Sequence, residues 1–111
     1  MGQTYTSSGV SIWDMDTYSG LYACPALTTA LVNSVYFCNR NIETGVATAI
    51  NLRFYDSSTS NYISIVSGVN LPGQASIQPI SAPLVLKAGD SLQVADRSGF
   101  ADVTASIMEI T

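Results

Sequence analysis

The stretch Val46-Ala-Thr-Ala-Ile-Asn-Leu-Arg-Phe-Tyr55 decides the fold class of this chain, because its larger apolar residues recur at every second position. In an extended strand, alternate side chains point to the same face. One face of this strand therefore carries Val46, Thr48, Ile50, Leu52 and Phe54. The alternation predicts a β-strand with one face in a core and the other against water or a partner.

A second strand is predicted upstream, over residues 31–39. Val35 and Phe37 share one of its faces, and the turn-prone sequence Asn39-Arg40-Asn41 ends it. We predict that this strand and the strand over residues 46–55 form a hairpin-like unit. The last third of the chain adds three short apolar runs, at 84–86, 92–94 and 103–110, which we predict to form a meander.

Together with weaker candidates, the chain holds about eight short strands and no helical repeat of apolar residues, which favours an all-β fold. We predict an antiparallel two-sheet β-sandwich, with either a jelly-roll or an immunoglobulin-like strand order. At 111 residues the chain fits a single domain, so residues 1–111 are assigned to one sandwich. Residues 1–9 are polar and lack a hydrophobic period, and we predict that they form a flexible N-terminal arm.

The composition points to a protein that works in contact with other proteins. Only 11% of the residues are charged and 47% are hydrophobic, which is typical of a subunit packed against its own copies or a larger partner. The net charge of −4 and four scattered basic residues argue against nucleic acid. No apolar run approaches the roughly 18 residues of a membrane helix, so no membrane partner is expected. Residues 1–8 lack the parts of a secretory signal, which predicts synthesis in the cytosol.

The sequence offers few groups for catalysis. It has no histidine, which is the commonest general base and metal ligand. No Gly-x-Ser-x-Gly elbow and no phosphate-binding glycine loop occurs. Asp14 and Asp16 could supply half of a calcium site, but too few further ligands lie near them, and a solvated polar turn fits them better. We therefore expect no catalytic residue, no cofactor and no metal.

Cys24 and Cys38 are the two cysteines of the chain. In a protein made in the cytosol, both are expected to be reduced thiols, buried as small apolar residues. A disulfide between them is the alternative for a protein that matures outside the cytosol.

Four aromatic residues fall in a segment with weak core signals: Tyr5, Trp13, Tyr18 and Tyr22. Three uses are open to their rings. They could cap the open end of the sandwich, anchor a partner protein, or stack on a sugar. We retain them as the candidate partner-binding residues.

Several segments resemble small virion structural proteins of tailed bacteriophages, over roughly residues 28–111. They are Thr28-Thr29, Ser34-Val-Tyr-Phe-Cys-Asn39, Leu84-Val-Leu-Lys-Ala-Gly-Asp-Ser-Leu-Gln-Val94 and the closing segment 103–110. The resemblance implies either a capsid decoration (cement) protein, often a trimer, or a small tail or neck component.

The function expected from these observations is that of a non-catalytic decoration subunit, which binds the capsid shell and stabilises it. Its expected partners are capsid or other virion proteins and further copies of itself, as a homotrimer or other homo-oligomer. It would reside in the virion after synthesis in the host cytoplasm. The alternatives are a tail or neck component, or a carbohydrate-binding module that recognises a receptor.

Overall fold

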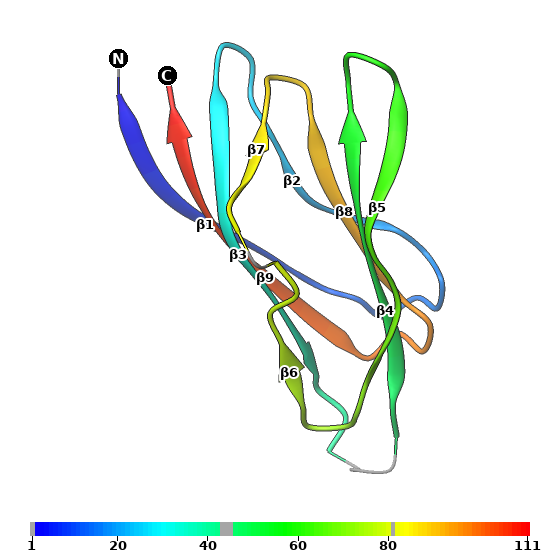
Figure 1. The fold of residues 1–111 in the computed structure, drawn as a ribbon. Coiled ribbons are helices and arrows are strands. Elements are labelled where there is room, and N and C mark those ends of the chain that lie inside the picture. The colour runs from blue at the N-terminus through cyan, green and yellow to red at the C-terminus, as the bar shows by residue number, and fades with distance from the viewer. Residues whose placement is uncertain (1, 43–45, 81) are drawn as a thin grey trace.

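The computed structural model describes residues 2–42, 46–80 and 82–111, and the description below is confined to them. Within this part of the chain the regular elements are all strands (Figure 1). They are β1 (Gln3–Ser11), β2 (Ser19–Ala23), β3 (Thr29–Asn39), β4 (Thr48–Asp56), β5 (Asn61–Leu71), β6 (Ser76–Ile77), β7 (Leu84–Leu86), β8 (Ser91–Asp96) and β9 (Ala101–Ile110). This part of the chain holds no helix with the length and apolar character to cross a bilayer.

The strands form two antiparallel sheets that pack face to face, which confirms the predicted all-β sandwich. The first, sheet A, has the order β1-β9-β3-β6, with β7 also paired to β3. The second, sheet B, has the order β2-β8-β4-β5. Most connections cross from one sheet to the other, and both ends of the chain lie at the same end of sheet A (Figure 1).

Two of the predicted strand pairings are wrong. The strands predicted over residues 31–39 and 46–55 exist as β3 and β4, but they lie in different sheets and do not form a hairpin. The three strands of the last third do not form a meander, because β8 lies in sheet B while β7 and β9 lie in sheet A. Alternation identifies which face of a strand is buried. It does not identify the neighbouring strand, because any strand with an apolar face toward the core can take that place.

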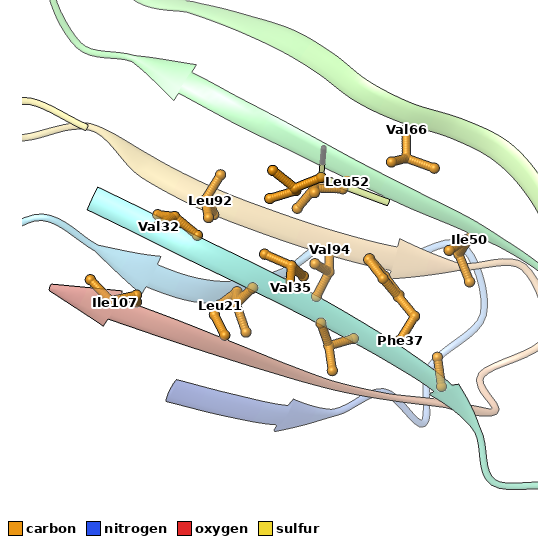
Figure 2. Packing of buried hydrophobic residues seen from close by; sticks show 14 of the residues in the cluster. Leu21, Val32, Val35, Phe37, Ile50, Leu52, Val66, Leu92, Val94 and Ile107 are labelled. Atoms are coloured by element: carbon orange, nitrogen blue, oxygen red, sulfur yellow. The ribbon is translucent and has the colours of Figure 1, made fainter. Parts of the chain in front are cut away.

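The core lies between the two sheets (Figure 2). Sheet A contributes Val32, Val35 and Phe37 from β3, and sheet B contributes Ile50 and Leu52 from β4 and Leu92 and Val94 from β8. All of them are fully buried, and burial of each such side chain stabilises the fold by about 1.5–3 kcal/mol. The sandwich therefore buries the alternating apolar face of β4 and the face of β3 that Val35 and Phe37 share.

The flexible arm predicted for residues 1–9 is a strand in the structure. Gln3–Ser11 forms β1, which pairs with β9 over its whole length, from Gln3 opposite Ile110 to Ser11 opposite Asp102. Beyond the strand, the main chains of Gly2 and Thr111 exchange two hydrogen bonds of 2.9 and 3.1 Å. Main-chain pairing holds an edge strand of polar residues without a hydrophobic period, and this is why the sequence pattern missed it. Met1 lies outside the described residues.

Asp90 holds the turn between β7 and β8 against the end of β4. Its carboxylate accepts hydrogen bonds from the Ser57 main-chain N–H (3.0 Å), the Ser57 hydroxyl (2.7 Å) and the Lys87 N–H (2.9 Å). Burial opposes ionisation of this group, but the hydrogen bonds from Ser57 and Lys87 outweigh it and lower the pKa of the Asp90 carboxyl from its ordinary value. The buried charge therefore fixes the spacing of two loops.

Replacement of Asp90 by Asn is expected to lower the free energy of unfolding by about 2 kcal/mol near neutral pH, because charge-assisted hydrogen bonds are lost. In the wild type, this contribution is present above the ordinary aspartate pKa of about 3.9 and is lost as the pH falls through the lowered pKa of the folded state. Urea unfolding at a series of pH values measures both effects. An identical acid dependence in wild type and Asp90→Asn would contradict the assignment.

Candidate partner-binding surfaces

The structure places the four predicted aromatic residues at different parts of the sandwich. Tyr5 lies on β1 and is 76% exposed, and Trp13 lies in the connection between β1 and β2 and is 72% exposed. Tyr18 ends the same connection, and Tyr22 lies in β2 and packs against the core. Three of the rings are therefore at the surface, but each has its own surroundings.

Trp13 lies on a guanidinium that is held in place by main-chain oxygens. The guanidinium carbon of Arg40 is 3.5 Å from the centre of the Trp13 ring. The Arg40 nitrogens donate to the carbonyl oxygens of Ala101 (2.8 Å) and Gly99 (2.6 Å) and form an ion pair with Asp102 at 3.2 Å. Arg40 thus joins the end of β3 to the loops on either side, and it holds Trp13 on the outside of that joint.

A second carboxylate supports the same end of the sandwich. Asp96 is fully buried and accepts hydrogen bonds from the N–H groups of Gly99 (3.0 Å) and Phe100 (2.7 Å) and from the Thr48 hydroxyl (3.2 Å). Gly99 has a φ of +76°, and a Cβ added to it would lie 2.5 Å from the Trp13 carbonyl oxygen. The loop that carries Trp13 therefore depends on a glycine at position 99.

We expect Gly99→Ala to destabilise the protein more than Gly68→Ala does. Both glycines have positive φ, which costs a non-glycine residue about 1–2 kcal/mol, but a Cβ at Gly68 meets nothing within 4 Å. At Gly99 the contact with Trp13 adds about 1–3 kcal/mol of overpacking. Thermal or urea unfolding of the two variants measures the difference, and equal losses of stability would refute the close approach.

The Asp14 and Asp16 pair, considered as half of a calcium site, lies in the connection between β1 and β2. The Asp16 main-chain N–H donates to the Asp96 carbonyl oxygen at 2.9 Å, which fixes the turn. Among the described residues, no group of three or more acidic, cysteine or histidine side chains is placed to hold a metal ion.

Tyr18 belongs to a cluster on the outer face of sheet B, built around Arg53 of β4. The guanidinium carbon of Arg53 lies 3.6 Å from the centre of the Tyr18 ring and 3.9 Å from that of Tyr62. The rings of Tyr62 and Tyr55 have their centres 5.0 Å apart, and the Arg53 Nε donates to Gln93 at 2.9 Å. Four strands or loops thus hold one planar cation between two tyrosine rings. We call Tyr18, Arg53, Tyr55, Tyr62 and Gln93 the arginine–tyrosine cluster.

No acidic side chain of the described residues forms an ion pair with Arg53; the ion pairs found there join Arg40 to Asp102 and Lys87 to Asp56. Of the Arg53 nitrogens, Nε is the one that donates to another described side chain, that of Gln93. Arginine between aromatic rings is a common anchor at protein interfaces, because the rings restrict the guanidinium in advance of binding.

Tyr22 faces inward, unlike the other three aromatic residues. It lies opposite Leu92 of β8, and its hydroxyl donates a short hydrogen bond to the Glu109 carboxylate of β9. Burial and the neighbouring Glu109 raise the pKa of the Tyr22 hydroxyl. An open hollow of about 420 Å³ runs beside it between β1, β2 and β8, and Tyr22 is the one ionisable group among the described residues that line it.

The outer face of sheet A is almost without charge. The described side chains on this face come from β1, β9, β3, β6 and β7, and Asp102, which is paired with Arg40, is the one charged residue among them. Tyr5 of β1, Tyr36 of β3 and Val85 of β7 are all exposed on it. We call this surface the sheet A outer face.

The two cysteines are free thiols and differ in burial. Cys24 is buried, as predicted, and burial raises the pKa of its thiol. Cys38 is exposed, so its predicted burial is wrong: it occupies the outward position on β3 next to the buried Phe37 and Asn39.

Sequence reasoning missed Arg40 and Arg53 as organisers of the surface. Arg53 could have been found, because its place in the alternation of residues 46–55 puts its side chain on the outer face. Arg40 carried no comparable signal, since its acceptors are main-chain oxygens of distant segments.

Comparison with known proteins finds chains with a similar fold. Neither a protein-family model nor a curated protein sequence matches this chain. A chain of the acid-stable capsid of Helicobacter pylori bacteriophage KHP30 has a TM-score of 0.56 and 11% identity, over 98% of this chain and 87% of its own. A chain of the IBDV viral particle has a TM-score of 0.59 and 7% identity, over 96% of this chain and 30% of its own.

A third similar structure is a chain of the Bacillus endospore appendages, described as disulfide-linked pili. Its TM-score is 0.53 at 11% identity, over 97% of this chain and 84% of its own. At such identities the three likenesses establish a shared sandwich fold.

Proposed function

We propose that this chain is a non-catalytic structural protein of a virus particle, and specifically a decoration subunit that binds the capsid shell and stabilises it. The observation that carries the proposal is the similarity of almost the whole chain to a capsid chain of bacteriophage KHP30, which is itself covered over 87% of its length. The proposed residence is the virion, after synthesis in the host cytoplasm.

The strand order supports this proposal. If β6 and β7, which both pair with β3, are taken as one interrupted strand, sheet A becomes β1-β9-β3-β6/β7 and sheet B is β2-β8-β4-β5. Two four-stranded sheets whose successive strands mostly alternate between layers form a jelly roll, an architecture that viral capsid domains use repeatedly. We therefore assign the jelly-roll order rather than the immunoglobulin-like order.

The surfaces support attachment rather than chemistry. The hollow beside Tyr22 is lined by hydroxyl, amide and apolar groups, and the buried carboxylates Asp90 and Asp96 are engaged with main-chain N–H groups. The arginine–tyrosine cluster offers a fixed cation to an acidic group of a shell protein, and Trp13 offers an exposed ring at one end. We assign attachment to these two places, with Arg53 as the central anchor.

The role is tested with particles that lack this chain. We expect them to assemble and package their genome but to release it at a lower temperature than complete particles, and purified chain to restore the release temperature. Unaltered release would contradict a stabilising role. Full heads without tails would instead indicate a tail or neck component.

The attachment surface is tested by adding variant chains to the same particles. Arg53→Ala is expected to weaken binding at least about tenfold, because it removes a buried interface anchor. Arg97→Ala is the matched control, since it removes the same charge from an exposed residue outside the cluster and should bind normally. Equal binding of both variants would exclude the cluster from attachment. Sugar binding on a glycan array that is lost in Trp13→Ala would instead favour the receptor-recognition alternative.

A further inference from the structure

The sheet A outer face is arranged in rows that cross the strands. Tyr5 of β1 lies opposite Met108 of β9, Met108 lies opposite Leu31 of β3, and Leu31 lies opposite Val85 of β7. Because directly opposed residues of neighbouring strands point to the same side, these four side chains form one continuous apolar row. Tyr5 and Val85, at its two ends, are 76% and 54% exposed.

The next two rows are made of smaller residues. Ser7, Ser106 and Ser34 oppose one another across β1, β9 and β3 and form a row of serines. Beyond it, Gly9 and Thr104 oppose one another on β1 and β9, and Tyr36 of β3 completes the row. The serine row therefore separates the row of bulky apolar side chains from a row whose side chains on β1 and β9 are small.

We propose that two copies of this chain bind each other through their sheet A outer faces, related by a two-fold axis that runs along the serine row. Such an axis places each strand over the same strand of the other copy, in the opposite direction. Tyr5 of one copy then lies over Gly9 of the other, and Met108 lies over Thr104. Over β1 and β9, bulky side chains thus meet small ones, as close packing of two sheets requires. On β3 the same axis places Leu31 of one copy against Tyr36 of the other.

The charge distribution favours a second copy over a different protein as the occupant. Each copy carries a net charge of −4, so two copies repel each other wherever their charged surfaces meet. On the described part of the sheet A outer face, the one charge belongs to Asp102, which Arg40 neutralises at 3.2 Å at the edge of the face. A partner of opposite charge would gain from acidic residues on this face, whereas an identical partner requires that they be absent.

The size of the face is sufficient for a reversible dimer. Strands β1, β9 and β3 have 9, 10 and 11 residues, and β6 and β7 have 2 and 3. At about 3.3 Å per residue and about 4.8 Å between strands, they cover about 550 Å² per copy. The two faces together bury about 1,100 Å², which is the size of a weak, reversible interface. We therefore expect dissociation in about the micromolar range. This dimer goes beyond the proposed function, because it forms whether or not the chain belongs to a virus particle.

Light scattering of the purified chain over the micromolar range tests the dimer. We expect the wild type to be dimeric at the upper concentrations and Thr104→Lys to raise the dissociation constant at least about a hundredfold, because it buries an unpaired charge. The matched control is Asn70→Lys, which adds the same charge to an exposed residue of β5 in sheet B and should remain dimeric. Circular dichroism verifies that each variant is folded.

A charge-exchange variant tests the position of the axis. Met108→Glu alone should dissociate the dimer, but Thr104→Lys combined with Met108→Glu should restore it, since the lysine of one copy then meets the glutamate of the other. Within one copy these positions are about 13 Å apart along β9, too far to form a pair. A monomeric or trimeric wild type, a dimeric Thr104→Lys, or a folded double variant that stays monomeric would overturn the proposal. None of these outcomes depends on the particle assays, so the two proposals fail separately.

Discussion

The insertion of β9 between β1 and β3 is the constraint on which the rest of this structure depends. β9 pairs with β1 from Asp102 to Ile110 and with β3 from Ala101 to Ile110. Its inward residues Ala101, Val103, Ala105 and Ile107 belong to the core, and its outward residues form the middle of the sheet A outer face. One strand near the end of the sequence thus orders the first strand, closes the core and joins the strands of the sheet A outer face.

The two outer faces have different chemistry, and this difference organises the proposed functions. Sheet B carries a guanidinium fixed between Tyr18 and Tyr62, which suits a directional contact with an acidic group. Sheet A carries serines, a glycine and an apolar row, which suit the close approach of an uncharged surface. Buried Asp90 and Asp96 hold the turns at the ends of the sandwich through hydrogen bonds from main-chain N–H groups. The two proposals thus assign a second copy to sheet A and a capsid shell to sheet B.

The sequence predicted the buried faces better than the pairing of strands. Ile50 and Leu52 were predicted on one face of a strand, and Val35 and Phe37 on one face of another, and the sandwich buries both faces. The alternation did not show that β3 pairs with β9, because main-chain hydrogen bonds do not depend on the order of side chains. The strand nature of β1 was missed for the same reason, and the aromatic neighbours of Arg53 were missed because they come from other segments of the chain. A single sequence does not show which distant segments of the chain are in contact.

Hydrogen exchange of the purified chain, resolved by residue, tests the β1-β9-β3 arrangement most directly. Main-chain amides that bond across a sheet exchange only when the structure opens. If β9 is inserted as described, its amides toward β1 and toward β3 are both protected, and the paired amides of β1 are protected with them. Amides of Gln3–Ser11 that exchange as fast as those of an unfolded chain would contradict the account, because sheet A would then end at β9 and the proposed face would lose its first strand.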